Sequence, residues 1–455
     1  MDTQFFFVPY RQVWDNWQAF MGERRNPEDD PSIYTLPKLS SVGLDNDSGS
    51  LYDYFGLPIN VSRPNNDVSA LPFRAYNLIW NEWYRDQNLQ DRVTENVDDG
   101  LDVITDYSLL KRGKRHDYFT SCLPWPQKGD PVSIPIGDEA PVMGLGVVTT
   151  AAPTVTSNTY TQTDGSTFTP SGGDPAKNFD TGWAAMVTGT SAPLTPEIYA
   201  DLTSATSITI NELRTAFQIQ KLLERDARGG TRYIELILSH FGVQSPDARL
   251  QRPEYLGGGT TRVNINPVAA TATDASIPQG NLAATGTAVS KAGFKKSFTE
   301  HGIIIGLTSV RADLTYQRGI ERFWTRETRY DFYWPTLAHL GEQAVLNKEI
   351  YAQGTSADDA VFGYQERFAE YRYKPSQITG LFRSDAAASL DVWHLSQDFA
   401  SLPVLGDTFI QETPPIDRIV AVPSEPDFLA DFWLDVKCDR PMPVYSVPGL
   451  IDHSW

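Results

Sequence analysis

Hydrophobic residues recur at helical spacing near the start of the chain. Between residues 10 and 21 the apolar positions lie three or four residues apart, and Gly22 follows where a left-handed cap would end a helix. A second helix is predicted from Pro72, a residue suited to the first turn of a helix, to Trp83. Its aromatic residues surround the helix, so we expect it to be buried on more than one side.

Two more helices are indicated in the middle of the chain. The segment Thr209–Glu212 has the spacing of a capping box, and the apolar positions that follow it end at Gly229 and Gly230. Apolar positions between residues 234 and 241 then predict a partner helix that stops at Gly242.

The rest of the pattern favours β structure with long loops. The 31 prolines and 33 glycines are scattered along the whole chain and divide it into short extended pieces. Candidate strands are rich in β-branched or aromatic residues and lie far apart in sequence. They are Phe5–Val8, Gly302–Tyr316, Ile416–Val422 and Phe432–Cys438.

The segment 141–210 differs in composition from the rest of the chain. It contains 16 threonines, five acidic residues and one basic residue. Such a segment cannot form a core by itself, so it is either a disordered linker or an exposed insertion that partners order. Trp183, Val187 and Tyr199 favour the insertion, because long loops in compact folds usually carry function.

Composition limits the classes of function. The length of 455 residues allows about three domains, or one large domain with long insertions. A formal net charge of -19 argues against a generally basic nucleic-acid binder, so any contact with nucleic acid must be local. Two cysteines cannot form a disulfide framework, and no stretch has the composition of a membrane-spanning helix.

Catalytic motifs are scarce. The chain has no nucleophile elbow and no phosphate-binding loop, and its six histidines lack the close spacing of a metal chelate. We therefore expect no catalytic residue, no metal and no cofactor. Paired carboxylates in a Trp-lined cleft leave one enzymatic alternative open, a β-rich carbohydrate-active enzyme or lectin.

One basic cluster has two interpretations. Lys111, Arg112, Lys114 and Arg115 precede the aromatic residues Tyr118 and Phe119. Four cations beside aromatic rings suit phosphate contact and base stacking on single-stranded nucleic acid. The competing interpretation, which we favour, is a set of ion pairs at a subunit interface, because the net charge gives no general attraction for phosphate.

Several long blocks resemble the major capsid proteins of microviruses, especially the gokushovirus-like group. The blocks keep their order along nearly the whole chain, which is a far stronger signal than a short motif. They are Val8–Glu23, Leu71–Leu89, Lys111–Gly129, Leu213–Gly258 and Arg440–Leu450.

The resemblance implies a fold and a function. The fold would be a single antiparallel jelly roll of about eight strands over residues 1–455, with very long loop insertions that contain helices. The protein would assemble with itself in the cytoplasm of a bacterial host into a small non-enveloped icosahedral virion. Its other partners would be a circular single-stranded DNA genome on the inner face, minor virion proteins and a bacterial surface receptor, with no membrane.

Two details follow from the same resemblance. In the family, a variable insertion that projects near the three-fold axes occupies the place of segment 141–210, which makes Trp183, Met186, Val187 and Tyr199 candidates for packing at such a protrusion. The family also has an N-terminal segment ahead of the stretch that resembles Met1–Thr3, so the sequence is expected to lack that segment.

Overall fold

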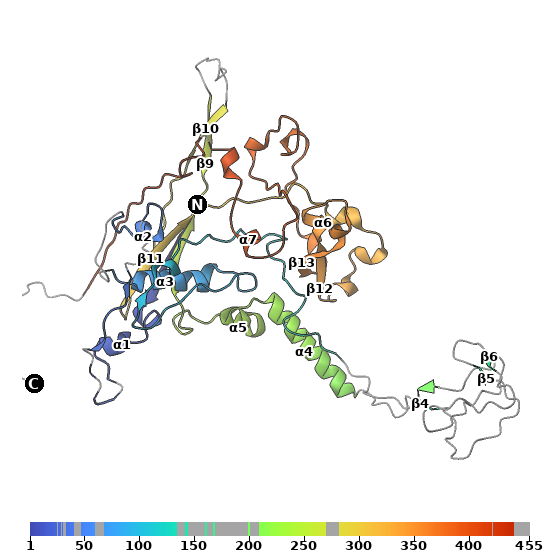
Figure 1. Ribbon diagram of the computed structural model, residues 1–455, viewed down its shortest axis with the longest axis horizontal. Coiled ribbons are helices and arrows are strands. Elements are labelled where there is room, and N and C mark those ends of the chain that lie inside the picture. The colour runs from blue at the N-terminus through green and yellow to red at the C-terminus, as the bar shows by residue number, and fades with distance from the viewer. Residues whose placement is uncertain are drawn as a thin grey trace, which may run out of the picture.

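The computed structural model describes residues 1–24, 26–28, 30, 33–40, 47–59, 68–133, 209–269, 282–420 and 422–440. It also gives the backbone of four two-residue strands between residues 142 and 200. In the described part, small sheets and short helices are joined by long irregular connections (Figure 1).

The helices and strands have the following bounds. The helices are α1 Trp17–Phe20, α2 Leu51–Tyr54, α3 Leu71–Ile79, α4 Ile210–Arg228, α5 Tyr233–Phe241, α6 Asn347–Ile350 and α7 Asp407–Ile410. The longer strands are β1 Asp2–Pro9, β8 Glu254–Thr260, β9 Asn264–Ala269, β10 Leu282–Thr287, β11 Gly302–Ser309, β12 Glu342–Leu346 and β13 Val361–Glu366. The two-residue strands are β2 Lys38–Leu39, β3 Leu101–Asp102, β4 Val142–Met143, β5 Tyr160–Thr161, β6 Thr167–Phe168 and β7 Tyr199–Ala200.

The largest described sheet is antiparallel and has the order β11-β1-β8. Strand β1 lies in the middle because it alternates two apolar sets: Phe6 and Val8 face one core, and Phe5 and Phe7 face the other side. A bulge between Phe5 and Phe6 shifts the pairing with β8. Strand β1 therefore fits a position covered on both faces, as its apolar run indicates.

Helix α3 joins two hydrophobic clusters. Ala75 and Ile79 pack into the cluster beneath β1, whereas Phe73 and Tyr76 pack into a second cluster with Tyr52. The prediction that this helix is buried on more than one side is confirmed. The helix continues as one π-helical turn, Trp80–Tyr84.

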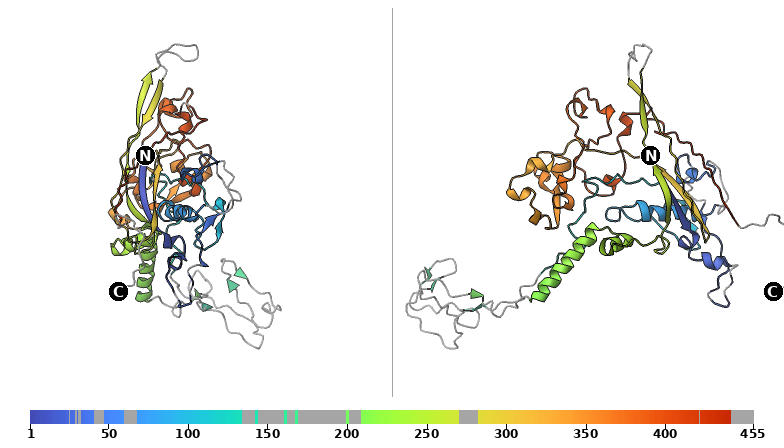
Figure 2. Two further views of the ribbon diagram at one scale, coloured as in Figure 1. Left: turned by 90° about the vertical axis from the view of Figure 1, so that its left-hand side faces the viewer. Right: turned by 180° about the vertical axis from the view of Figure 1, so that it is seen from behind.

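A third cluster lies around the hairpin of β12 and β13. Val345 and Ile350 are fully buried there against Phe119, Phe362 and other aromatic residues. At the far end of the molecule from α4, strands β9 and β10 project as a separate hairpin (Figures 1 and 2).

The predicted helices of the middle region are confirmed. Helix α4 has the capping box at Thr209 and Glu212, and α5 ends at Gly242, whose φ of 68° is left-handed. The first predicted helix is shorter than its apolar spacing suggested. It divides into a 3-10 turn, Tyr10–Gln12, and α1, although Gly22 does take a left-handed φ of 103°.

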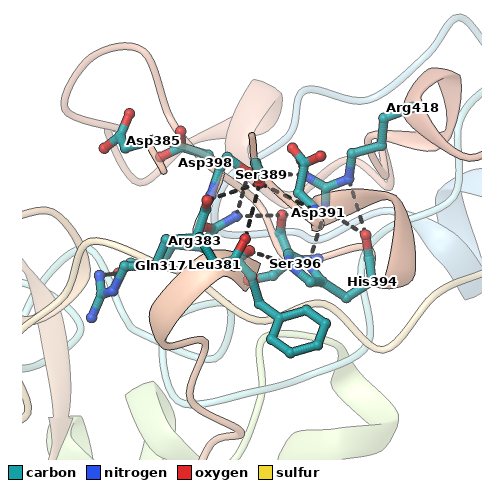
Figure 3. A network of polar contacts seen from close by, with 12 residues as sticks. Gln317, Leu381, Arg383, Asp385, Ser389, Asp391, His394, Ser396, Asp398 and Arg418 are labelled. Carbon is teal, nitrogen blue, oxygen red and sulfur yellow. Dashed lines mark hydrogen bonds and ion pairs between the residues drawn. The ribbon is translucent and has the colours of Figure 1, made fainter. Parts of the chain in front are cut away.

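Neither Ile416–Val422 nor Phe432–Cys438 forms a strand in the described chain, so these two predictions are wrong. The predicted strand Gly302–Tyr316 is too long. Strand β11 ends at Ser309 instead of Tyr316. The stretch from Ile416 instead forms a 3-10 helix, Ile416–Arg418. Its Arg418 donates to the carbonyl oxygens of His394 and Ser396, each at 2.7 Å, which fixes the backbone in a turn (Figure 3).

Residues Phe432–Cys438 form no strand because they have no partner strand in the described part of the chain. Every residue from 422 to 440 is exposed there. Small antiparallel sheets, together with the parallel pair β2 and β3, are thus the β structure that the described residues contain.

Candidate assembly and DNA interface

The basic segment 111–115 runs beside residues 410–412 as a short bridge. The amide of Lys114 donates to the carbonyl oxygen of Ile410 at 2.7 Å. The amide of Glu412 donates to the carbonyl oxygen of Arg112 at 2.9 Å. Because extended backbone alternates its side chains, Arg112 and Lys114 point inward while Lys111 and Arg115 are exposed.

Arg112 is engaged inside the chain. Its Nη1 donates to Asp2 Oδ2 at 3.1 Å and to Ser309 Oγ at 2.7 Å, and its guanidinium lies 5.2 Å from the centre of the Tyr84 ring. Burial lowers its pKa. These contacts join the basic segment to β1 and β11, so Arg112 stabilises the fold.

Lys114 is buried against aromatic rings. Its Nζ lies 4.2 Å from the centre of the Phe409 ring and donates to Gln397 Oε1 at 2.9 Å. Burial lowers the pKa of Lys114 to about 8, against the opposing effect of Asp117 and Glu412. A cation in this position cannot reach a phosphate group outside the protein.

Asp2 is the centre of a buried ion cluster. Its carboxylate lies 2.8 Å from Arg311 Nη2, 3.1 Å from Arg112 Nη1 and 3.8 Å from Arg115 Nη2. Burial acts to raise the pKa of Asp2, but the hydrogen bond and charge of Arg311, with the charge of Arg112, lower it. Arg115 also contacts Asp313 at 3.3 Å and keeps 41% of its side chain exposed.

The four predicted cations therefore divide into two pairs. Arg112 and Lys114 contact groups inside the chain, whereas Lys111 is exposed and Arg115 is exposed but paired with Asp2 and Asp313. Sequence spacing alone could not separate them, because the division depends on which side of the bridge each residue occupies.

A second arginine cluster was missed by sequence reasoning. A pocket of about 390 Å³ is lined by four arginines, Arg11, Arg92, Arg232 and Arg252, and by two glutamates. Each of these arginines already has a carboxylate within the chain, at distances of 2.6 Å, 2.9 Å, 3.3 Å and 3.4 Å respectively. The pocket is thus a compensated ion network, built from residues too distant in sequence to be recognised as one cluster.

An exposed aromatic surface lies beside β12 and β13. Its large side chains are about half exposed or more, and Trp324 reaches 74%. Two hydrogen bonds connect this surface to the hairpin region. Arg322 donates to the carbonyl oxygen of Ala344, and Arg367 donates to that of Tyr330. The members of the aromatic surface are Phe323, Trp324, Tyr330, Phe332, Tyr333 and Trp334. Exposed Trp and Tyr of this kind are the usual anchors of protein interfaces.

The candidate protrusion lies mostly outside the described residues. Trp183, Met186 and Val187 are not among them, and Tyr199 is described only as backbone of β7, opposite Met143. The insertion and its packing residues stay predictions.

The described residues contain neither a metal-binding cluster nor a membrane-spanning helix. No group of three or more potential ligands among them could hold a metal ion. No helix found in that part of the chain is long and apolar enough to cross a bilayer.

Comparison with known proteins shows the family to which the chain belongs. The family model described as "Capsid protein (F protein)" matches residues 1–450. "Capsid protein VP1" of Bdellovibrio phage phiMH2K is 48% identical over 99% of this chain and 85% of that protein. The proteins of the same name from Chlamydia phage 1 and Spiroplasma virus 4 are 45% and 38% identical, again over 99% of this chain, and over 86% and 85% of their own lengths. The chain therefore belongs to the phage capsid protein family named after the F protein.

Proposed function

We propose that this chain is the major capsid protein of a small bacterial virus and that its copies assemble into a closed icosahedral shell. The family match over residues 1–450 carries this proposal. The role is structural, and the comparisons give no support to the carbohydrate-active alternative. The finer features are part of the same proposal: a jelly roll in the assembled subunit, a single-stranded DNA genome inside, minor virion proteins and a host receptor.

The free energy of the exposed aromatic surface also supports the proposal. Exposed aromatic side chains such as Trp324 cost free energy in an isolated chain and become favourable when a neighbour covers them. Truncation of a central interface Trp commonly costs about 2 kcal/mol or more.

Electron microscopy and sedimentation of the purified chain test the proposal. We expect closed particles of uniform size, with far fewer particles for Trp324→Ser. Tyr54→Ser is the matched control, because Tyr54 on α2 is 69% exposed but lies outside the aromatic surface. A chain that stays monomeric at every salt concentration would contradict a capsid role.

A further inference from the structure

Lys114 and Gln397 form a buried polar pair between two segments that lie far apart in the sequence. Each residue is 8% exposed, and Lys114 Nζ donates to Gln397 Oε1 at 2.9 Å. The nitrogen of the same carboxamide is also held, because Gln397 Nε2 donates to the Thr413 carbonyl oxygen at 3.2 Å. An amine thus lies against a carboxamide whose position is fixed at both ends.

Aromatic rings surround the amine. Lys114 Nζ lies 4.2 Å from the ring centre of Phe409 on α7, 5.8 Å from that of Tyr316 and 5.9 Å from that of Phe399. These rings belong to the hydrophobic cluster around β12 and β13 or pack against it. The pair therefore lies in apolar surroundings, where a charged amine is poorly solvated.

The same surroundings make Lys114 a nucleophile. Burial lowers its pKa to about 8, although the charges of Asp117 and Glu412 oppose this change. At pH 7 about a tenth of the chains hold a neutral amine at this position, compared with fewer than about one in a thousand for an ordinary lysine. Only the neutral amine has a lone pair for attack on a carbonyl carbon.

Glu412 supplies an acid beside the pair. It precedes Thr413, which holds the carboxamide, and it lies in the segment that bridges to the basic residues. Its Oε1 accepts from the Ala312 amide at 3.0 Å, whereas its buried Oε2 has no hydrogen-bond partner among the described residues. Burial raises the pKa of Glu412, against the Ala312 hydrogen bond and the charges of Arg311, the buried lysine and Arg115. Such a carboxyl group can both give and take a proton.

We propose that Lys114 and Gln397 join in an isopeptide bond, with Glu412 as the group that transfers protons. The neutral Lys114 nitrogen attacks Gln397 Cδ, which is one C=O bond, about 1.2 Å, from the oxygen that the nitrogen already contacts. As the Cδ–Nε2 bond breaks, Glu412 gives its proton to the leaving nitrogen, which departs as ammonia. The Glu412 carboxylate then takes one proton from the Lys114 nitrogen, and a neutral secondary amide remains.

The bond would join two residues that are 283 positions apart in the chain. It would restrict the unfolded chain as a disulfide does, in a protein whose two cysteines, Cys122 and Cys438, are free. The reaction takes place within one folded chain. The inference therefore goes beyond the proposed shell and does not depend on it.

Mass spectrometry of the full chain tests the proposal. The folded chain is incubated at about pH 9, above the pKa of Lys114, and is then unfolded in acid and weighed. We expect a loss of about 17 Da, the mass of one ammonia. A tryptic digest should contain peptides 113–115 and 384–418 joined to each other. This joined peptide distinguishes the isopeptide bond from loss of ammonia at an asparagine.

Three variants and an unfolded control identify the reacting groups. Lys114→Arg keeps the cation and a hydrogen-bond donor but provides no nucleophile, so we expect no loss of mass. Glu412→Gln should slow the reaction at least about tenfold. Lys111→Arg, at an exposed position of the same segment, should react like the natural chain. The natural chain in concentrated urea should not react, and this control needs no variant to fold.

The opposite results would overturn the proposal. One is an unchanged mass of the folded natural chain after several days at about pH 9, with both peptides recovered unlinked. Another is an equal loss of ammonia from Lys114→Arg or from the urea-unfolded chain. Chain kept at about pH 6 holds Lys114 protonated and is the unlinked reference, so the effect of the free amine on stability is measured on this form.

Discussion

Arg74 shows how one buried charge organises the start of the chain. Its side chain is 1% exposed and donates to both oxygens of Asp102, at 2.7 Å and 2.6 Å. It also donates to the carbonyl oxygens of Val13 and Asp98 at 3.0 Å and 2.9 Å. One guanidinium thus joins α3, β3 and the turn before α1.

Removal of Arg74 should be strongly destabilising, because Asp102 would be left buried without a counter-charge. We expect Arg74→Met to lower the free energy of unfolding by about 3–5 kcal/mol, measured by urea denaturation. Arg92→Met is the control: Arg92 is 54% exposed in its ion pairs with Glu82 and Glu95, so its loss should cost less than about 1 kcal/mol. Equal effects of the two substitutions would show that the Arg74 network does not stabilise the fold.

Lys114 should make stability depend on pH in the alkaline range. Its pKa is about 8 in the folded chain and about 10.4 in an unfolded one, so between these values only the unfolded chain holds the proton. Below pH 8 the folded chain bears the whole free-energy cost of burying the charged Lys114. This cost disappears as the pH rises and Lys114 loses its proton, so the free energy of unfolding increases at high pH.

The measurement compares the natural chain with Lys114→Met across this range. The difference in the free energy of unfolding should shift in favour of the natural chain by about 3 kcal/mol between pH 8 and the unfolded pKa. Lys111→Met, at an exposed position, should show no such trend. A difference that stays constant with pH would mean that the buried lysine has an ordinary pKa.

At the scale of elements, α4 depends on local interactions more than on packing. Ala227 is its one buried residue, and apolar side chains such as Phe217 are exposed. Thr209 Oγ1 accepts from the Glu212 amide at 3.2 Å, and Glu212 Oε2 accepts from the Thr209 amide at 2.8 Å. This capping box satisfies two of the free donors at the start of the helix.

Thr209→Ala should therefore reduce helix content and lower stability by about 1 kcal/mol. Circular dichroism during thermal unfolding measures both effects. Thr215→Ala is the matched control, since the Thr215 hydroxyl only donates back to the Asn211 carbonyl within the helix, at 2.8 Å. If both variants unfold alike, the cap does not control α4.

At the scale of the whole molecule, the exposed cations provide the test of DNA contact. We expect Lys111→Ser combined with Arg115→Ser to leave particles intact and to reduce packaged DNA, with a weaker dependence of DNA retention on salt. Arg112→Ser should instead reduce folded protein, because Arg112 contacts Asp2 and Ser309. Loss of assembly by the exposed pair, without a selective loss of DNA, would favour the subunit-interface interpretation.

The Thr-rich segment belongs to the same scale. We propose that it is a surface insertion used for attachment to the host, and that shortening residues 150–181 preserves particles while abolishing adsorption to bacteria. A long loop tolerates such a change, because closure costs only about 0.6 kcal/mol per doubling of its length. Normal adsorption of the shortened particles would remove the receptor role.

The sequence determined those features that depend on neighbouring residues. Helices α3, α4 and α5 were predictable because caps, a first-turn proline and apolar spacing act within a few turns, and the aromatic and β-branched run Phe5–Val8 indicated β1. The order of the long blocks indicated the family.

The tertiary structure decided the features that depend on distant partners. Arg112 and Lys114 point inward because residues 410–412 and Asp2 lie beside them. Four arginines from separate segments line one pocket. Strand patterns at Ile416–Val422 and Phe432–Cys438 failed in the described chain, because a strand exists only where another backbone supplies its hydrogen bonds.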